Sequence, residues 1–345
     1  MTAWADRLLA APLPHTPVRR SPSTAAAVVL AAGEGRRLRP VTEQLAKPLA
    51  PVLNVPLLYW NLAALDSGGF GPIVVNTWAK AEQVEEAART LRRRGDQAPV
   101  LVREATLTGP AGGLAACRTA LPDDRCCVVF SGDALTDLPP AELAEAHLAS
   151  GADLTILATS VPDPHRFGVL SLSGDTVLGL QEKPASPPPD AMVSCGIYAV
   201  GPRAFRLLNP RPGHPYDFKD LVPELLAAGL RVRVHRLTGF WNDVGTTEAL
   251  REANLWALRA VPDRVATQRQ RDGLWIQGTP RLADGLRAAE ALVGDAASIG
   301  PGVTLRRCVV GPGARIGAGA TVVDSVLLPG ARVPDGRHIE AETVL

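Results

Sequence analysis

The sequence predicts an α/β domain with a mainly parallel sheet and helices on both faces, followed by a short parallel β-helix. Two observations carry this fold class. Over residues 25–256, short apolar runs alternate with longer amphipathic stretches, as buried parallel strands and their covering helices do. From residue 293 onward, an aliphatic residue followed by glycine returns about every six positions, which is typical of a solenoid of hexapeptide repeats.

The predicted strands of the first domain are short and rich in β-branched residues, at residues 26–32, 73–76, 100–102, 126–130 and 154–158. Helices are expected between them, over residues 81–94, 112–121 and 140–149. Residues 162–189 contain many prolines and predict turns and short strands that lie over one edge of the sheet.

The domain boundaries follow from changes in composition. We expect a flexible leader over residues 1–24, the α/β domain over 25–256, a connector over 257–292 and the β-helix over 293–345. The six-residue repeat is expected to slip near Val310 and near Val333. A twin-arginine export signal at Arg19-Arg20 is disfavoured, because no cleavage site follows the apolar stretch.

Composition excludes several classes of protein. The chain has 345 residues, of which 46% are apolar and 21% charged, as in ordinary globular proteins. A formal net charge of +1 gives no electrostatic basis for a nucleic-acid or membrane partner. No apolar run reaches the roughly 18 residues that a membrane helix needs. Five cysteines without metal-ligand spacing predict a reduced, cytoplasmic protein.

A glycine-rich turn follows the first predicted strand. The run LAAGEGRRLRP at residues 30–40 continues to Lys47. Glycines let backbone N–H groups approach a polyphosphate, and the arginines and the lysine supply compensating charge. A dinucleotide fingerprint would need glycine where Leu38 stands, and the Gly-Lys-Ser/Thr of a Walker loop does not occur in the sequence.

Two aspartates from distant segments are candidate metal ligands. Asp133 follows the predicted strand at 126–130, at the end where open α/β sheets bind ligands. Asp243 lies in the segment GFWNDVGT at residues 239–246. Mg²⁺ takes oxygen ligands and usually only one or two carboxylates, with water and substrate phosphates as the rest. Either aspartate alone is typical of a cap or a turn, but with the glycine turn the pair indicates a magnesium site.

Together these motifs resemble the signature of the sugar-1-phosphate nucleotidylyltransferases. The glycine turn is similar to the family's L-A-A-G-x-G-T-R-L-x-P-L-T, and the segments around Asp133 and Asp243 are similar to its N-G-D and G-x-W-x-D-[IV]-G-T. The resemblance covers residues 25–256. It implies a Rossmann-like domain and, in the mannose-1-phosphate guanylyltransferase branch, a C-terminal left-handed β-helix.

The resemblance assigns a role to each matching residue. It implies catalytic roles for Arg37, Lys47 and Lys183, and metal binding by Asp133 and Asp243. It implies nucleotide binding by Leu30, Ala32, Gly33, Gly35, Arg36, Glu104, Gly109 and Gly112, and sugar binding by Gly168, Glu182, Lys183 and Ser194. The chain departs from the family pattern at four positions. Arg36 stands where the family has Thr or Ser, Ala46 where it has Pro, and Ser131 and Ser194 where it has Asn.

The implied reaction joins an NTP and a sugar 1-phosphate into an NDP-sugar with release of pyrophosphate, with Mg²⁺ as cofactor. Residues 75–78 favour GTP with mannose 1-phosphate, and glucose 1-phosphate with dTTP, UTP or ATP stays open. A catalytically silent regulatory subunit also stays open, because four motif positions depart from the pattern. A second, acetyltransferase activity is disfavoured, because only His338 lies in the β-helix. A homo-oligomer is expected.

Overall fold

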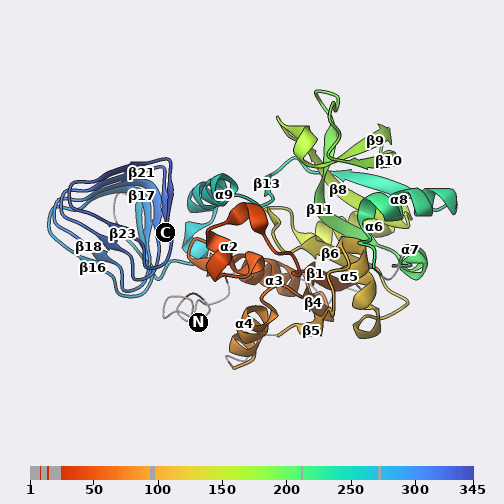
Figure 1. Ribbon diagram of the computed structural model, residues 1–345, viewed down its shortest axis with the longest axis horizontal. Helices are drawn as coiled ribbons and strands as arrows, with labels where there is room; N and C mark the ends of the chain where they lie inside the picture. The colour runs from red at the N-terminus through yellow and green to blue at the C-terminus, as the bar shows by residue number, and fades with distance from the viewer. Residues whose placement is uncertain (1–7, 9–13, 15–24, 94–97, 211–212, 271–272) are drawn as a thin grey trace. The chain divides into compact units, whose positions relative to one another are not determined.

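The computed structural model describes residues 8, 14, 25–93, 98–210, 213–270 and 273–345 (Figure 1). The chain divides into two compact units, which are taken in turn. The sheet unit comprises residues 17–34 and 64–243, and the coil unit comprises residues 1–16, 35–63 and 244–345. The leader expected over residues 1–24 lies outside the described residues, except for Leu8 and Pro14, which are both buried.

A nine-stranded sheet forms the centre of the sheet unit. Its strands lie in the order β5 (Val100–Arg103), β4 (Ile73–Thr77), β1 (Ala26–Leu30), β6 (Cys127–Ser131), β11 (Met192–Val200), β8 (Leu154–Ser160), β12 (Val232–Arg236), β10 (Thr176–Glu182) and β9 (Gly168–Ser173). The first four are parallel, and β12 is parallel to β8. Strand β11 runs antiparallel to both of its neighbours, β6 and β8. The hairpin β9–β10 lies at the edge, which confirms the prediction for residues 162–189.

Helices cover both faces of this sheet. Leu114 of α5 (Pro110–Ala116) and Leu221 of α8 (Phe218–Ala227) share one core cluster with Val28 of β1. Val29 points to the other face, because side chains alternate along a strand, and it is also fully buried. The remaining helices are α3 (Leu57–Ser67), which runs from the coil unit into the sheet unit, α4 (Ala81–Arg93), α6 (Pro140–Ser150) and α7 (Pro202–Leu207). The α/β class is therefore confirmed.

The C-terminal strands of the coil unit stack in parallel ladders, called here the coil stack. They are β15 (Leu274–Ile276), β16 (Arg281–Leu282), β17 (Arg287–Val293), β18 (Ser298–Ile299), β19 (Thr304–Val310), β20 (Arg315–Ile316), β21 (Thr321–Val323), β22 (Val326–Leu327), β23 (Arg332–Val333), β24 (His338–Glu340) and β25 (Thr343–Val344). Each rung lies 17 residues after the one before, the separation of Ala291 from its partner Cys308. This strand-rich region is consistent with a parallel β-helix, and its stacking begins at Leu274, within the stretch assigned to the connector.

The 17-residue rung explains where the six-residue repeat slips. Buried aliphatic residues follow one another at steps of six, six and five residues, as Val293, Ile299, Leu305 and Val310 do. In each rung, the five-residue step contains a corner residue with a positive φ. On successive rungs these residues are Glu290, Arg307, Asp324 and Ala341. The slip near Val310 is confirmed. The second slip lies between Val322 and Leu327, so its prediction near Val333 was wrong.

Buried amides join the coil stack to earlier parts of the coil unit. Asn254 lies on α9 (Thr247–Ala260) and is fully buried. Its Oδ1 accepts from the N–H of Leu53 at 2.8 Å, and its Nδ2 donates to the carbonyl of Pro51 at 2.9 Å. Both partners belong to the hairpin of β2 (Pro51–Val52) and β3 (Val55–Pro56). At the hairpin tip, Asn54 Nδ2 donates to the Val310 carbonyl of β19 at 3.0 Å. The hairpin is therefore fixed between α9 and the coil stack.

Replacing Asn254 by alanine is expected to destabilise the protein by about 2–4 kcal/mol, because a buried N–H and a buried carbonyl lose their partner and a cavity remains. Urea unfolding would measure the change. Glu252→Ala is the matched control, since Glu252 lies exposed on the same helix and should change stability by less than about 0.5 kcal/mol. Equal losses for the two variants would contradict a special role for the Asn254 amide.

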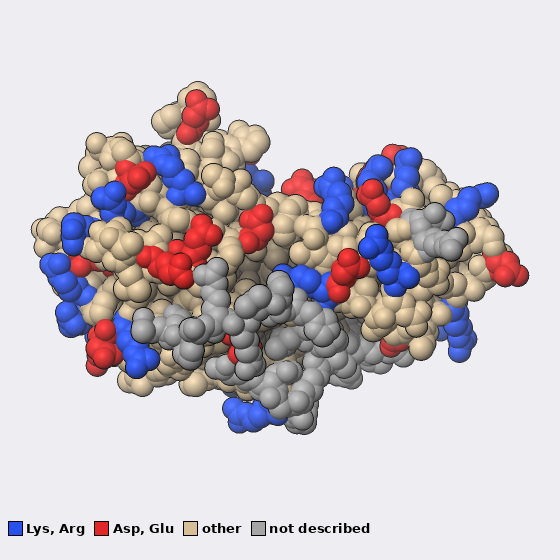
Figure 2. All heavy atoms as spheres, turned by 180° about the vertical axis from the view of Figure 1, so that it is seen from behind, with Lys and Arg blue, Asp and Glu red and all other residues tan. Residues whose placement is uncertain are grey.

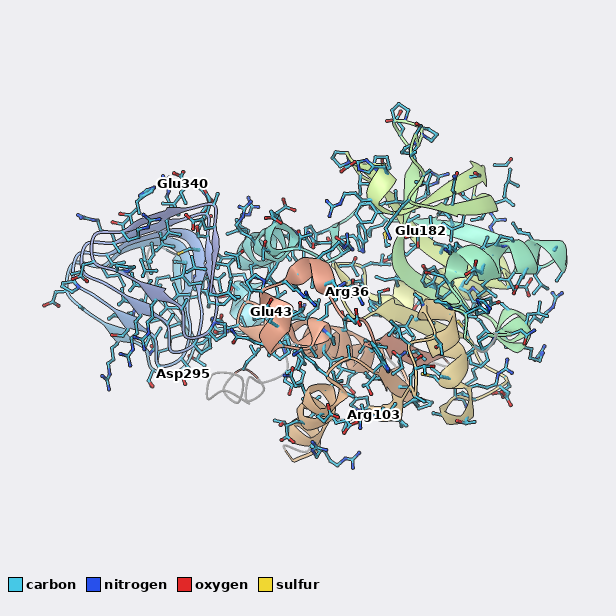
Figure 3. All side chains as sticks on the ribbon, in the orientation of Figure 1. Arg36, Glu43, Arg103, Glu182, Asp295 and Glu340 are labelled. Carbon is cyan, nitrogen blue, oxygen red and sulfur yellow. The ribbon has the colours of Figure 1, made fainter. Side chains whose placement is uncertain are left out.

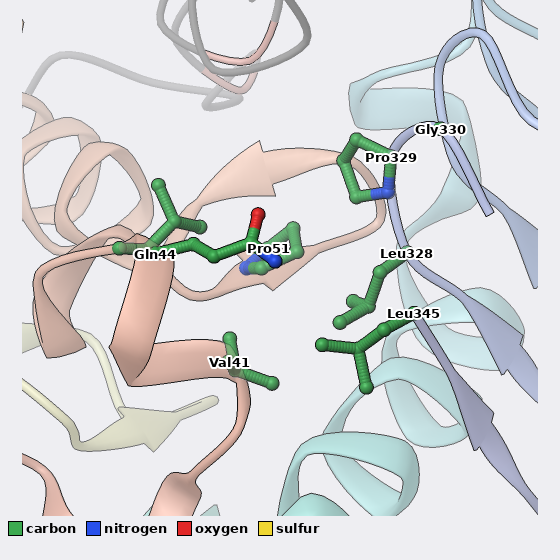
Figure 4. A pocket seen from close by; sticks show the side chains of 8 residues that line it. Val41, Gln44, Pro51, Leu328, Pro329, Gly330 and Leu345 are labelled. Carbon is green, nitrogen blue, oxygen red and sulfur yellow. The ribbon is translucent and has the colours of Figure 1, made fainter. Parts of the chain in front are cut away.

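A cavity of about 210 Å³ lies within the coil unit (Figure 4). It is lined by Val41, Gln44, Leu45, Pro51, Leu328, Pro329, Gly330 and Leu345. The first three belong to α2 (Val41–Gln44) and the residue after it, and Leu328 to Gly330 follow β22. None of these residues was a predicted site residue.

In the described ranges, no helix is long and apolar enough to cross a membrane.

Candidate active site

The carboxyl ends of three neighbouring strands meet in the sheet unit. Leu30, at the end of β1, pairs with Asn76 of β4 and with Ser131 of β6. Gly132 then donates its N–H to the Leu30 carbonyl oxygen at 2.8 Å, and a Cβ on Gly132 would lie 2.7 Å from that same oxygen. Glycine is therefore needed for the chain to pass over the end of β1, and this close approach sets where the next residue, Asp133, leaves the sheet.

A buried amide and carboxylate order the residues after β1. The N–H of Ala31 donates to Asn76 Oδ1 at 2.8 Å, and Asn76 Nδ2 donates to Glu104 Oε1 at 2.5 Å. The other Glu104 oxygen accepts from the N–H of Thr108 at 3.1 Å. Glu104 is only 7% exposed, and both of its oxygens have partners within the protein. Glu104 thus links the glycine turn to the segment 104–108, a positioning role that depends on Asn76 and that the sequence did not reveal.

Tyr216 fixes the glycine segment that follows. Its carbonyl accepts from the N–H groups of Ala111 and Gly112, both at 3.1 Å, and its own N–H donates to the Thr108 carbonyl at 2.8 Å. Gly109 has a φ of +83°, and a Cβ there would lie 2.6 Å from the Tyr216 carbonyl oxygen. The predicted nucleotide-binding residues Gly109 and Gly112 therefore lie where the backbone at the start of α5 closely approaches the backbone of Tyr216.

The two predicted metal ligands lie at one end of a short ladder. Strand β7 (Leu135–Thr136) pairs antiparallel with β13 (Trp241–Asn242), with Asn242 opposite Leu135. Continuing this register sets Asp243 opposite residue 134, next to Asp133. Both aspartates are partly buried. In the described part of the chain, no group of three or more His, Cys, Asp or Glu side chains could hold a metal. A pair of carboxylates fits Mg²⁺, which usually takes one or two.

Of the four predicted sugar-side residues, Gly168 and Glu182 lie on the hairpin β9–β10, Lys183 directly follows it, and Ser194 lies on β11. Gly168 pairs with Glu182, and a Cβ on Gly168 would lie 3.2 Å from Glu182 Oε2. Lys183 has a φ of 45°, its N–H donates to the Phe167 carbonyl, and its Nζ lies 2.6 Å from Glu182 Oε1. A side chain in this conformation costs roughly 1–2 kcal/mol, which is typical of functional sites. Figure 3 marks Glu182, which is one-third exposed.

The two serines that replace asparagines lie around one residue, Gly196 of β11. Ser194 Oγ accepts from the Gly196 N–H at 3.3 Å and donates to the Tyr198 hydroxyl at 3.1 Å. Gly196 has a φ of +68°, and a Cβ there would lie 2.8 Å from Ser131 Oγ. The two departures from the family pattern are thus neighbours and shorten the side chains at a single place.

Trp241 connects the aspartate ladder to the sugar-side residues. Its Nε1 donates to the Cys195 carbonyl at 2.9 Å, and its ring meets the Phe167 ring edge-on with centroids 5.3 Å apart. Because Asp243 lies two residues after Trp241 and Gly168 follows Phe167, this contact brings both groups of predicted residues into one part of the sheet unit.

The structure also places Asp217, which the sequence analysis missed, near these residues. Asp217 is the N-cap of α8, and its Oδ1 accepts from the Phe218 N–H. Asp217 and Asp220 also form a capping box, in which each side chain accepts from the backbone N–H of the other. Burial, and to a lesser extent the Glu182 carboxylate, raises the pKa of Asp217 above its usual range. The Phe218 ring stacks on Tyr198 at 3.6 Å. The D-x-x-D spacing of the capping box was the available signal.

The predicted cations on the nucleotide side belong to the coil unit, whereas Lys183 lies in the sheet unit. Arg36 and Arg37 form the short helix η1 (Arg36–Leu38) and are exposed, and Lys47 begins η2 (Lys47–Leu49). Gly35 precedes η1 with a φ of +68°, and a Cβ there would lie 3.0 Å from Lys47 Cβ. Gly35 thus brings Lys47 next to the turn that carries the two arginines, of which Figure 3 labels Arg36. Leu30, Ala32 and Gly33 lie in the sheet unit.

On the face shown in Figure 2, Lys and Arg side chains are interspersed with Asp and Glu. This distribution agrees with the formal net charge of +1.

The fold and these motifs define a nucleotidyl-transferring class, and the chain belongs to the nucleotidyl transferase family, whose model matches residues 26–259. It is 31% identical over 246 residues to a glucose-1-phosphate thymidylyltransferase of Streptomyces griseus, covering 69% of this chain and 67% of the relative. It is 29% identical over 282 residues to a mannose-1-phosphate guanylyltransferase of Mycobacterium tuberculosis, covering 81% and 77%.

A solved structure also resembles the chain. A crystal structure from Bacillus anthracis, assigned as a glucose-1-phosphate thymidylyltransferase, matches with a TM-score of 0.60 at 25% identity, covering 68% of this chain and 95% of that one. The family predicted from the motifs is therefore confirmed. Relatives that differ in both nucleotide and sugar match this chain at similar identity, so these comparisons do not separate the substrate branches.

Proposed function

We propose that this protein transfers a nucleotidyl group from an NTP to a sugar 1-phosphate, giving an NDP-sugar and pyrophosphate. One observation carries the proposal. Through Trp241, the ladder that ends at Asp133 and Asp243 is joined to the hairpin that holds Gly168 and Glu182. The two carboxylates that would bind a metal and the acid that would bind the sugar thus lie in the same part of the domain, which suits this reaction. The relatives named above act on sugar 1-phosphates.

The chain's own residues would position the substrates and neutralise charge, since phosphoryl chemistry of this kind needs little covalent help. Lys183 would bind the sugar phosphate, and Glu182 would accept hydrogen bonds from sugar hydroxyls. Arg37 would bind the β- and γ-phosphates that leave, and Lys47 the α-phosphate. The sugar phosphate is largely a dianion near pH 7 because its second pKa is about 6, so no general base is required.

Asp133 and Asp243 would hold Mg²⁺ in this proposal. When bound, the ion would supply charge neutralisation at the α-phosphate. The backbone of Gly33, Gly35, Gly109 and Gly112, with Leu30, Ala32 and Arg36, would line the nucleotide. Glu104 would act there through its hydrogen bonds to Asn76 and Thr108 rather than by direct contact with the nucleotide.

For the substrates we propose GTP with mannose 1-phosphate first, and glucose 1-phosphate with dTTP, UTP or ATP second. A matrix of five NTPs against common sugar 1-phosphates, measured by pyrophosphate release, tests the reaction and the pair together. We expect one pair to exceed the others clearly. Release from none of them would favour the silent regulatory subunit, which Arg36, Ala46, Ser131 and Ser194 keep open.

We further propose that the coil stack is a left-handed β-helix and that the chain forms a homo-oligomer in a reducing, cytoplasmic compartment. The 17-residue parallel rungs support the first statement. The buried, free state of all five cysteines supports a reducing compartment. Light scattering on the purified chain tests the oligomer, and a monomer at micromolar concentration would contradict it.

Replacing Glu182 by glutamine is expected to raise the KM for the sugar 1-phosphate about tenfold and to leave the KM for the NTP unchanged, because a charged acceptor of sugar hydroxyls is lost. Steady-state kinetics with each substrate varied in turn measures both constants. Gln181→Ala is the matched control, since Gln181 is exposed and precedes Glu182 on β10 with its side chain on the opposite face. Equal effects on both KM values would assign Glu182 a general structural role.

A further inference from the structure

One outward column of the coil stack places arginines on successive rungs. In the ladder of β16, β18, β20 and β23, Arg281 pairs with Ser298, Ser298 with Arg315, and Arg315 with Arg332 (Figure 1). All four residues are exposed, whereas the residue that follows each of them in its strand points into the core of the stack. We call Arg281, Arg315 and Arg332 the arginine column.

In the part of the chain that the structure describes, none of the three side chains of the arginine column forms an ion pair or a hydrogen bond. The next outward positions along the same strands are Ala283, Gly300, Gly317 and Pro334. The Asp335 carboxylate lies over Gly317 and accepts from the Ala318 N–H at 2.9 Å. Like charges directly opposite on neighbouring strands are destabilising. The column therefore carries an electrostatic cost that no described contact offsets.

A corner of the same stack shows the opposite arrangement. Glu290, Arg307 and Asp324 follow one another at the 17-residue step, so that their charges alternate. Arg307 Nε donates to Asp324 Oδ1 at 2.6 Å, and these hydrogen bonds hold the pKa of Asp324 below its usual range. At this corner the charges are thus paired along the axis of the stack, in contrast to those of the arginine column.

The spacing of the column suits a linear anion. Neighbouring strands lie ~4.8 Å apart, so Arg315 and Arg332 start about that far apart, and Arg281 lies two rungs, roughly 10 Å, from Arg315. Guanidinium groups bind phosphate oxygens in pairs. A single phosphate would meet neighbouring arginines only, whereas a chain of phosphates can reach all three. Single-stranded nucleic acid would need aromatic platforms, and the outward positions here are Ser, Ala, Gly and Pro.

We propose that the arginine column binds an oligophosphate chain that lies along the axis of the coil stack. The oligophosphate is either inorganic polyphosphate or the phosphate tail of a nucleotide. The column contains none of the residues proposed for nucleotidyl transfer, so this inference does not depend on the proposed function.

Calorimetric titration of the full-length protein with tripolyphosphate in magnesium-free buffer tests the proposal. The test variant is R315S/R332S, because serine already occupies the column at Ser298. The control is R287S/R306S, since Arg287 and Arg306 are exposed on other strands of the same stack. We expect the test variant to lose one binding event or to bind at least tenfold more weakly, with the control unchanged. Inorganic phosphate should bind wild type at least tenfold more weakly than tripolyphosphate.

Two further arms complete the experiment. In the first, ATP is added to the complex with tripolyphosphate. If ATP displaces tripolyphosphate from the column, the ligand is the phosphate tail of a nucleotide, and if it does not, the ligand is inorganic polyphosphate. R315S/R332S should melt at or slightly above the wild-type temperature, because two opposed like charges are removed, and it should release pyrophosphate at the wild-type rate. These two results show that the fold and the proposed site are intact. Identical titrations for R315S/R332S and wild type, or no tripolyphosphate binding by wild type, would overturn the proposal whatever the activity.

Discussion

Asp133→Ala is expected to slow magnesium-dependent pyrophosphate release about a thousandfold. Several kcal/mol of charge neutralisation at the α-phosphate would be lost, and each ~1.4 kcal/mol is tenfold in rate. The fold should persist, because the close approach after β6 depends on Gly132 and its hydrogen bond to Leu30 rather than on the Asp133 carboxylate. Single-turnover kinetics at saturating substrates measures the rate of pyrophosphate release, and a parallel urea titration measures the stability of the fold.

Asp123→Ala is the matched control, since Asp123 lies exposed in the turn before β6 and should leave the rate unchanged. Asp243→Ala should resemble Asp133→Ala, and the double variant should be little slower than either single one, because residues that act as a unit are not additive. Full activity of Asp133→Ala at low magnesium would remove Asp133 from the proposed metal site, and the same result for Asp243→Ala would remove Asp243.

Gly109→Ala is expected to destabilise the protein by about 2–4 kcal/mol and to raise the KM for the NTP at least tenfold. Alanine would have to keep a φ of +83° with its Cβ 2.6 Å from the Tyr216 carbonyl oxygen. The backbone of segment 109–113 would shift away from Tyr216, and the N–H groups of Ala111 and Gly112 would lose their acceptor. Urea unfolding and NTP titration kinetics measure the two effects.

Gly174→Ala separates the two causes. Gly174 also has a positive φ, +58°, but nothing lies within 4 Å of the position of its Cβ. This control should lose only the conformational part, roughly 1–2 kcal/mol, and keep its KM. Equal behaviour of the two variants would mean that the contact with Tyr216 has no effect of its own.

The local motifs predicted the family, whose model matches residues 26–259. The ladder of β7 and β13 begins two residues after Asp133 and ends one residue before Asp243, and Gly168 pairs directly with Glu182. Asn76, Tyr216 and Asp217 were missed in these roles because they act through partners far along the chain. The Asn76 amide, for example, accepts from Ala31, 45 residues earlier. No spacing within one segment records such a contact.

The sequence by itself determined the α/β domain, the glycine turn after β1 and a repetitive, strand-rich C-terminal region, because strand runs, glycine positions and repeat length are local properties of the chain. Only the tertiary structure decided which rungs align. One short step of five residues turns the six-residue repeat into a rung of 17, the separation of Ser298 from Arg315. A register different by one residue would move every side chain of a strand to its other face. That register stacks Arg281, Arg315 and Arg332 in one column and alternates the charges at the neighbouring corner.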